Sequence, residues 1–290
     1  MHSEMKPFLK WAGGKRWLAR SAPQLFELKY ERYLEPFLGS GAIFFHLLPN
    51  IAILSDSNKR LINLYQCLKE SPSKILDQLK IHEKNHNDSY YYTIRSSQTD
   101  DRYVEAGIFL YLNRTCWNGL YRENMKGEFN VPRGTKDTII FPDDNFLAIS
   151  EALAGAEIKA CDFSSVLKVA RNGDLVFVDP PYTVKHNFNG FVKYNEKIFS
   201  WDDQVRLSHE IIEAVKRGAS VILTNADHPS IHELYNGYGV RMSVERESVL
   251  AAKSNYRGRT TEAVFLFGQI STNDVSTGQK RFSLQPETDR

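Results

Sequence analysis

The chain has 290 residues, of which 42% are hydrophobic and 25% are charged. This is the composition of an ordinary folded protein, and it excludes a disordered, collagen-like or coiled-coil chain. At ~150 residues per domain, the length predicts two domains. Because 37 Lys and Arg nearly balance 35 Asp and Glu, for a net charge of +2, a polyanionic partner would have to be bound by local basic clusters. Residues 1–20 and 241–260 contain such clusters.

The cysteines and the apolar runs indicate where the protein resides. Cys67, Cys116 and Cys161 are an odd number with no Cys-x-x-Cys spacing, which argues against a disulfide framework or a structural zinc site. The sequence contains neither an apolar run of the ~18 residues that a membrane span needs nor a hydrophobic signal core at its start. We therefore expect a cytoplasmic protein that does not contact a membrane.

Four short apolar runs predict buried parallel strands, because they are rich in β-branched or aromatic residues and too short for helices. They are Arg32–Glu35, Ile51–Leu54, Leu175–Val178 and Ser220–Leu223. Helical patterns alternate with these runs, and the clearest begins with a capping box formed by Ser200 and Asp203 and ends at Gly218. This alternation predicts an α/β layered sheet, in which ligands bind at the carboxyl ends of the strands.

The stretch between the second and third of these strands breaks the alternation with polar, Tyr-rich helical patterns and a Gly- and Pro-punctuated piece. We expect residues 57–144 to form an inserted domain, and residues 1–56 and 145–270 to form one discontinuous domain around it. Residues 271–290 are polar, and we expect a flexible tail there.

A glycine-containing turn follows the first predicted strand and leads into an apolar helix from Ala42 to Leu48. Gly39 and Gly41 in this turn let the backbone approach a ligand closely. The third glycine of the dinucleotide fingerprint is replaced by Phe44, which disfavours an NAD site. Asp56, at the end of the next strand, can accept both hydroxyls of a ribose, so the pattern fits a nucleoside cofactor. A packing turn followed by a solvent-facing Asp would give the same pattern.

The third strand ends in Asp179-Pro180-Pro181-Tyr182. Two prolines remove amide donors and fix the backbone, so the Asp179 carboxylate and the Pro180 carbonyl can present two acceptors to one amino group. Two acceptors that hold the hydrogens of an aromatic amine favour a nitrogen with an available lone pair, which stabilises the transition state of its alkylation. Tyr182 offers a face on which a planar base can stack. A simple turn after a strand is the plainer interpretation.

These motifs, together with the opening Lys10-Trp11-Ala12-Gly13-Gly14-Lys15, resemble the Dam family of DNA adenine-N6 methyltransferases of the D12 class, including GATC methylases of restriction–modification systems. The similarity runs from about Phe8 to Phe267. It implies a Rossmann-like class I methyltransferase sheet, with an inserted and mainly helical target-recognition domain that carries a β-hairpin. It also implies an enzyme that uses S-adenosyl-L-methionine, flips adenine out of GATC in double-stranded DNA and methylates it without a metal. A cognate restriction endonuclease is a candidate partner.

The resemblance implies roles for individual residues. Asp179, Pro180, Pro181 and Tyr182 match the catalytic motif, and Asp179 also matches a residue of the cofactor site. The other residues that match the cofactor site are Trp11, Lys15, Phe37, Gly39, Gly41, Asp56, Asp162 and Phe163. Among them, Trp11 would cover the methionine end, Lys15 would meet its carboxylate, and Asp162 with Phe163 would bind the adenine. The loop from Thr183 to Tyr194 would close over the flipped base.

The insert carries the residues that match DNA contacts in the family. Leu120, Arg122 and Pro132 occupy base-contact positions, where an Arg suits guanine and an apolar side chain suits a thymine methyl. Lys10 matches the contact to the first guanine, and Trp117 and Asn118 match residues near the space that the flipped adenine vacates. Arg114, Asn124 and Asn130 match phosphate contacts. Residues 252–259 resemble a family loop near the DNA backbone.

Several alternatives stay open. A related target such as GATG or CATG would need an overlapping motif set. Methylation of RNA or of a glutamine amide more often uses Asn-Pro-Pro-Tyr, and a catalytically silent binding protein could keep the same motifs. The residues His82-Glu83-Lys84-Asn85-His86 fit a zinc-protease pattern, but their surroundings are polar and no third ligand motif follows. No cysteine follows a proline, which argues against cytosine-C5 methylation.

Overall fold

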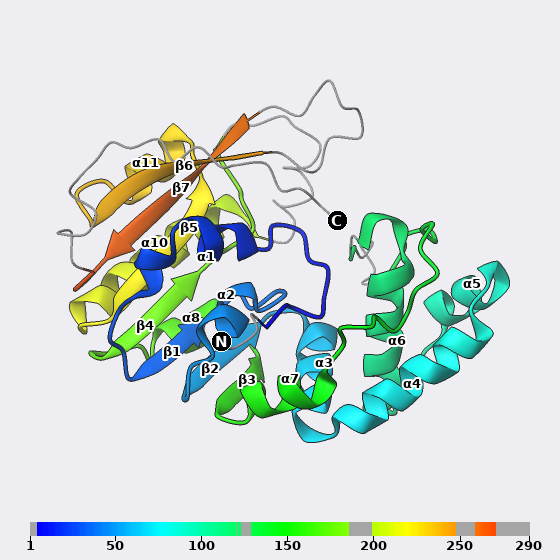
Figure 1. The fold of residues 1–290 in the computed structure, drawn as a ribbon. Helices are drawn as coiled ribbons and strands as arrows, with labels where there is room; N and C mark the ends of the chain where they lie inside the picture. Colours follow the sequence, from blue (N-terminus) through cyan, green and yellow to red (C-terminus); the bar gives the residue numbers. More distant parts are fainter. Residues whose placement is uncertain (1–4, 120, 123–128, 186–198, 248–258, 271–290) are drawn as a thin grey trace. The chain divides into compact units, whose positions relative to one another are not determined.

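The computed structural model describes residues 5–119, 121–122, 129–185, 199–247 and 259–270. The chain has a mixed α/β fold, and its contacts divide it into two compact units (Figure 1). The first unit comprises Met1–Trp17 and Leu38–Cys161, and the second comprises Leu18–Phe37 and Asp162–Arg290. This division differs from the domain boundaries that the sequence suggests, which stay a prediction. The predicted tail lies outside the described residues.

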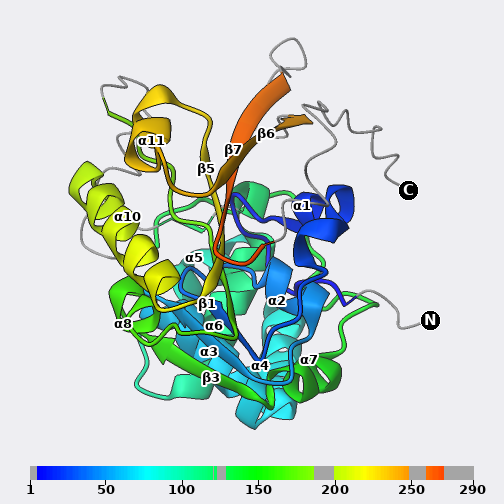
Figure 2. The ribbon, with the colours of Figure 1, turned by 90° about the vertical axis from the view of Figure 1, so that its left-hand side faces the viewer.

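Among its described residues, the second unit contains five strands in the order β1-β4-β5-β7-β6. They are β1 (Arg32–Glu35), β4 (Asp174–Val178), β5 (Ser220–Ala226), β6 (Val240–Glu247) and β7 (Arg259–Phe267). β4 pairs in parallel with both β1 and β5, whereas β7 runs antiparallel to β5 and to β6, and the views of Figures 1 and 2 show these last three strands side by side. Three of the four predicted strands are therefore confirmed as parallel neighbours.

The helices of the second unit include the one with the predicted capping box. They are the 3₁₀ helix η1 (Pro23–Phe26), α8 (Phe163–Leu167), α10 (Trp201–Lys216) and α11 (Pro229–Leu234), while α1 (Arg16–Ser21) begins in the first unit. The Ser200 hydroxyl accepts the Asp203 N–H at 3.1 Å, and the Asp203 carboxylate accepts the Ser200 N–H at 2.9 Å. Gly218, with φ of +96°, follows the end of α10. α10 packs against α8 and β5 (Figure 2).

The first unit contains the parallel pair β2 (Ala52–Asp56) and β3 (Ala156–Ala160). The predicted second strand is thus confirmed, but it begins one residue later and ends two residues later than predicted; Ile51, which is 53% exposed, precedes it. Helix α2 (Ala42–Leu47) follows the glycine turn as predicted, and α7 (Phe146–Leu153) precedes β3.

Helices make up the region from β2 to residue 119, and the described residues from 129 to 145, before α7, are not helical. These helices are α3 (Lys59–Glu70), α4 (Pro72–Asn85), α5 (Asp88–Ser96), α6 (Arg102–Thr115) and the 3₁₀ helix η2 (Trp117–Gly119). The ten residues from Ala106 to Thr115 are all buried, because α3 and α4 both pack against α6. The helical character expected of this region is therefore observed.

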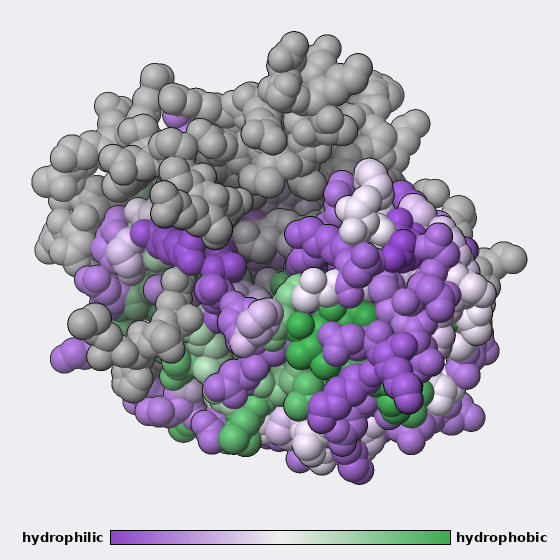
Figure 3. Space-filling model, turned by 45° about the vertical axis from the view of Figure 1, so that its right-hand side comes forward, coloured by the Kyte–Doolittle hydropathy of each residue, from purple (hydrophilic) through white to green (hydrophobic). Residues whose placement is uncertain are grey.

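The surface of the described residues is largely hydrophilic on the face in Figure 3, with a smaller hydrophobic area among them. Within the described ranges, no helix is long and apolar enough to cross a membrane.

Candidate active site and DNA-contact residues

The Asp179–Tyr182 motif follows β4, whose five residues are all buried. Both ends of the motif have hydrogen-bond partners on neighbouring strands. The Thr224 hydroxyl of β5 donates to Oδ1 of Asp179 at 2.6 Å, and the Tyr182 hydroxyl donates to Oε2 of Glu262 of β7 at 2.7 Å. The structure therefore holds the carboxylate and the aromatic ring of the motif in fixed places.

The electrostatic surroundings keep the Tyr182 phenol protonated. Burial raises its pKa well above the usual value, and the negative charges of Asp179 and Glu262 raise it further. A protonated phenol can donate, as the hydrogen bond to Glu262 requires.

Two buried amides support the middle of the motif. The Pro181 carbonyl accepts from the side-chain amide of Gln204 at 3.3 Å, and Gln204 in turn accepts from Asn225 at 3.1 Å. Both amide side chains are fully buried.

Aromatic rings gather around Phe163, one of the residues predicted to bind the cofactor's adenine. The ring of Phe37, at the end of the β1 turn, stacks on Phe163 with centroids 5.4 Å apart, and the ring of Phe199 meets both at steeper angles. Two predicted cofactor residues, Phe37 and Phe163, are thus brought together in the second unit.

Asp162, the other predicted adenine-binding residue, is paired with Arg206 of α10. The two carboxylate oxygens accept from the guanidinium at 2.6 and 2.9 Å, and Oδ1 also caps α8 by accepting the Ser164 N–H at 2.9 Å. The hydrogen bonds from Arg206 lower the pKa of Asp162 to about 2. The guanidinium also lies 4.1 Å from the centroid of Phe163. Arg206, which the sequence analysis missed, therefore engages both adenine-binding candidates.

The first unit brings together three further cofactor candidates, Trp11, Gly39 and Asp56. Gly39 has φ of +47°, and a Cβ built there would lie 2.8 Å from the indole of Trp11. Its N–H donates to Oδ2 of Asp56 at 3.0 Å, and the Tyr65 hydroxyl donates to its carbonyl at 3.1 Å. Gly41 also has positive φ, at +64°. At this turn the backbone therefore lies close to the Trp11 indole, and its approach to a ligand stays a prediction.

The charges of this group are set by burial and by backbone donors. Burial raises the pKa of Asp56, while hydrogen bonds from the N–H groups of Asn58 and Gly39 oppose that rise. Lys15 is buried, and its ammonium donates to the Gly13 carbonyl at 2.7 Å. Trp11 stacks on Tyr121 with centroids 5.7 Å apart, so its indole has a fixed plane.

Lys10, the predicted guanine contact, is fixed to α6 through its backbone. The Asn113 amide accepts the Lys10 N–H at 3.1 Å and donates to the Lys10 carbonyl at 2.7 Å. The Lys10 side chain packs so closely on Gly119 that a Cβ there would lie 2.5 Å from it. Burial, and next the charge of Lys136, lower the pKa of Lys10. Lys10 and the η2 turn of Trp117 and Asn118 are therefore neighbours.

Two described segments of the chain, residues 117–122 apart from residue 120 and residues 129–133, are joined by backbone hydrogen bonds. The Trp117 N–H donates to the Pro132 carbonyl at 2.9 Å, and the Asn130 N–H donates to the Arg122 carbonyl at 3.3 Å. The side chain of Arg122 donates to the Asn130 amide at 3.2 Å, and Trp117 is 52% exposed. Leu120 and Asn124 lie outside the described residues, as do residues 186–194 of the predicted closing loop.

Arg114 does not have the surroundings of a phosphate contact, and this prediction is corrected. It is 1% exposed, and its guanidinium donates to the Asp144 carboxylate at 2.7 Å and to the Phe8 carbonyl at 3.2 Å. The plane of the guanidinium also lies over Phe141, 4.4 Å from its centroid. Arg114 is therefore a buried residue that forms an ion pair with Asp144, which lies 30 residues further along the chain.

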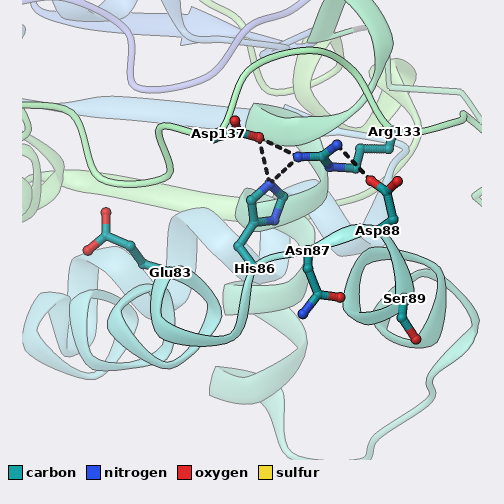
Figure 4. A pocket seen from close by; sticks show the side chains of 7 residues that line it. All are labelled: Glu83, His86, Asn87, Asp88, Ser89, Arg133 and Asp137. Atoms are coloured by element: carbon teal, nitrogen blue, oxygen red, sulfur yellow. Dashed lines mark hydrogen bonds and ion pairs between the residues drawn. The ribbon is translucent and has the colours of Figure 1, made fainter.

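The two histidines of the His82–His86 pattern pack into the α4–α6 region. His82 stacks on Tyr111 with centroids 4.6 Å apart, and its Nδ1 lies 2.9 Å from the Tyr90 hydroxyl. His86 contacts Arg133 and Asp137 beside a cavity of about 690 Å³ (Figure 4). In the described part of the chain, no three His, Cys, Asp or Glu residues are arranged to hold a metal ion.

Comparisons with known proteins identify the family. Residues 11–249 match the model of the D12 class N6 adenine-specific DNA methyltransferases. The Type II methyltransferase M1.LlaDCHI of Lactococcus lactis subsp. cremoris is 38% identical over 269 residues, which is 90% of this chain and 94% of that protein. A DNA adenine methylase of Haemophilus influenzae is 31% identical, over 91% of this chain and 94% of that protein.

Among solved structures, a putative RNA methyltransferase from Pyrococcus horikoshii has a TM-score of 0.37 and 12% identity, over 91% of this chain and 89% of that chain. This likeness is too low to support an argument. The family match and the sequence relatives are sufficient: the chain belongs to the D12 class of N6 adenine-specific DNA methyltransferases, and it is an enzyme that modifies DNA.

Proposed function

We propose that this enzyme transfers a methyl group from S-adenosyl-L-methionine to N6 of the adenine in GATC, after rotating that adenine out of double-stranded DNA. The observation that carries the proposal is the Asp179–Tyr182 motif at the end of β4, in which Thr224 holds the carboxylate and Glu262 holds the aromatic ring. An amine-orienting acceptor beside a stacking surface is the chemistry that methylation of an extrahelical adenine needs.

The residues of the cofactor prediction have suitable chemistry for this cofactor. In the first unit, Gly39 brings the backbone close to Trp11 and Asp56. Asp56 would accept the ribose hydroxyls, Trp11 would cover the methionine end, and the Lys15 ammonium would meet the carboxylate. Gly41 would keep the turn open for this approach.

In the second unit, Phe163 and Phe37 would contact the adenine of the cofactor, and Asp162 would accept from its amino group. Asp179 is also a residue of the proposed cofactor site. When bound, S-adenosyl-L-methionine supplies an electrophilic methyl group on a sulfonium.

The protein's own groups prepare the target amine. The Asp179 carboxylate and the Pro180 carbonyl accept its two hydrogens, which orients the nitrogen lone pair for in-line attack. Tyr182 stacks on the flipped base, and such stacking contributes ~1–3 kcal/mol. Pro181 fixes the backbone between these groups, and flipping costs a few kcal/mol.

Residues of the first unit would recognise the site. Arg122 would make a bidentate contact to guanine, Leu120 and Pro132 would contact a thymine methyl, and Lys10 would contact the first guanine. The remaining proposed contacts are Trp117 and Asn118, near the space left by the adenine, and Asn124 and Asn130, on phosphates. The neighbouring positions of Lys10 and η2, and of Arg122 and Asn130, support this assignment.

The test is transfer of a labelled methyl group from S-adenosyl-L-methionine to a GATC duplex and to matched duplexes with one base changed. Labelling confined to GATC is the expected result. Equal labelling of all duplexes would refute the specificity, and preferential labelling of GATG or CATG would replace it with a related target. Flipping is measured separately, with a duplex that carries 2-aminopurine in place of the target adenine. This base is not methylated at N6, and an increase in its fluorescence when the enzyme binds reports flipping.

We propose that the enzyme acts in the cytoplasm, with double-stranded DNA as its binding partner. Because one relative is named a type II methyltransferase, we also propose a restriction endonuclease that cuts the same site as a functional partner. Cleavage of unmethylated host DNA in a strain that lacks the methyltransferase gene would support this pairing, and intact DNA would contradict it.

A further inference from the structure

Glu262 is a buried carboxylate that the proposed chemistry does not use. It lies on β7, directly before the apolar run from Ala263 to Phe267, and is 5% exposed. A carboxylate at such a place is costly to the fold unless donors are directed at it. The Tyr182 hydroxyl is one such donor, at 2.7 Å.

Thr224 is the matching feature on β5. It is fully buried, and its hydroxyl lies 2.6 Å from Oδ1 of Asp179. A short contact from a hydroxyl to a carboxylate is a charge-assisted hydrogen bond, which is stronger than one between neutral groups.

The strand register places the two residues on one face of the sheet. Ala226 of β5 pairs with Glu262 of β7, and Thr224 pairs with Val264. Because side chains alternate along a strand, Thr224 and Glu262 project on the same side as diagonal neighbours. The two adjacent strands can be followed in Figure 1.

We propose that Thr224 and Glu262 are positioning residues for methyl transfer: Thr224 sets the plane of the Asp179 carboxylate, and Glu262 sets the ring of Tyr182. This inference rests on the proposed roles of Asp179 and Tyr182. Without such contacts, the Asp179 carboxylate could rotate about its last side-chain bond, and the Tyr182 ring could move together with the backbone that carries it. The hydrogen bonds from Thr224 and to Glu262 restrict both motions before DNA arrives.

Thr224 is tested with a matched pair of variants in the full chain. Thr224→Val keeps the shape and removes the hydroxyl, whereas Thr224→Ser keeps the hydroxyl. We expect Thr224→Val to lower the single-turnover transfer rate by roughly 10²-fold, the scale of a small misplacement, with unchanged affinity for DNA and cofactor. Thr224→Ser should restore most of that rate. Equal rates in wild type and Thr224→Val would overturn the role of Thr224.

Glu262 is tested by coupling to Tyr182. Glu262→Gln keeps an acceptor for the phenol, and Glu262→Leu removes it. We expect Glu262→Leu to slow transfer in the wild-type background and to have no further effect in Tyr182→Phe, because Tyr182→Phe already lacks the hydroxyl. Glu262→Gln should be faster than Glu262→Leu. Additive losses in the double variant would show that Glu262 does not act through Tyr182.

Control measurements separate these outcomes from misfolding and from failure of the proposed function. The unfolding midpoint and cofactor affinity of each variant show whether it is folded, and the Thr224 pair stays informative if Glu262→Leu does not fold. Wild-type rates in Asp179→Ala would refute the proposed function itself. An inactive Asp179→Ala together with a fully active Thr224→Val would refute only the inference about Thr224.

Discussion

The Asp179–Tyr182 motif and the segment around η2 hold their functional side chains in different ways. In the motif, Asp179 and Tyr182 are hydrogen-bonded to buried side chains of neighbouring strands. Around η2, the segments are joined through backbone groups, and Trp117 remains exposed. The groups proposed to perform the chemistry are therefore fixed in advance, whereas Trp117 and Arg122, which are proposed to contact DNA, are exposed and can adjust to a base pair.

The largest expected effect concerns Arg114, which lies before η2 and is buried, unlike the exposed Trp117. Arg114 forms a buried ion pair with Asp144, so Arg114→Met should lower the free energy of unfolding by about 3–5 kcal/mol, because an uncompensated charge remains. Urea unfolding measures this loss. A double variant Arg114→Met with Asp144→Leu removes both charges and should recover part of it. Unchanged stability in Arg114→Met would show that this arginine is available for another role.

Asp179→Ala should reduce methyl transfer by about 10²–10³-fold, the scale for loss of one preorganised group in an active site. Its affinity for S-adenosyl-L-methionine should change little, because the role proposed for the carboxylate is mainly on the target amine. Labelled-methyl transfer and cofactor titration by calorimetry measure the two quantities. A loss of cofactor binding that accounts for the loss of rate would assign Asp179 to the cofactor site alone.

His82 should make stability depend on pH. Burial lowers its pKa from the ordinary 6.5 to about 4. The unfolded chain therefore takes up a proton first as the pH falls, so stability is full above pH 6.5 and decreases toward pH 4. At ~1.4 kcal/mol per pKa unit, the decrease amounts to about 3 kcal/mol.

The matched variant for this effect is His82→Phe, which keeps a ring stacked on Tyr111 and cannot titrate. Urea unfolding at a series of pH values should give a smaller decrease for the variant than for the wild type between pH 6.5 and 4. Parallel curves would show that His82 does not contribute to the pH dependence.

Arg122→Ala should relax discrimination at one base pair by ~1–3 kcal/mol. Because the side chain is exposed, the free energy of unfolding should stay within about 0.5 kcal/mol of wild type. Competition between GATC and singly changed duplexes measures the first quantity. Unchanged site preference would refute the proposed guanine contact.

Arg206→Lys should give the smallest effect. Lysine keeps the charge near Asp162 but loses the bidentate geometry. The pKa of Asp162 should rise from about 2 toward the ordinary 3.8, while Asp162 stays ionised at neutral pH. We expect only a few-fold change in cofactor affinity by calorimetry, since the paired groups are about half exposed. A hundredfold change would make Arg206 part of the cofactor site.

The sequence was sufficient for elements whose signals are local. The strands that became β1, β2, β4 and β5, the capping box at Ser200 and the helix after Gly41 all follow from adjacent residues. Three strands were missed. β3 alternates buried and exposed residues over only part of its length, and β6 and β7 depend on antiparallel pairing with each other and with β5.

The partners of functional residues were harder to predict, because they come from distant parts of the chain. Arg206, Thr224 and Glu262 approach Asp162, Asp179 and Tyr182 from 44, 45 and 80 residues away. A weak signal for two of them exists in the sequence, since Thr224 is a polar residue directly after the predicted buried strand Ser220–Leu223 and Glu262 is a charged residue directly before the apolar run from Ala263 to Phe267. Arg114 was misassigned for a related reason: its match to a phosphate contact of the family did not reveal that its side chain is buried.

The close contact between Gly39 and Trp11 constrains how this enzyme can diverge. Any side chain at position 39 would meet the indole and would also have to adopt φ of +47°. Replacing Trp11 by a smaller residue would remove the clash with a side chain at position 39, but the unfavourable positive φ would remain. No single second substitution can therefore remove both the clash and the backbone strain. Position 39 should therefore be among the least tolerant to substitution in a library of active variants, whatever host the enzyme serves.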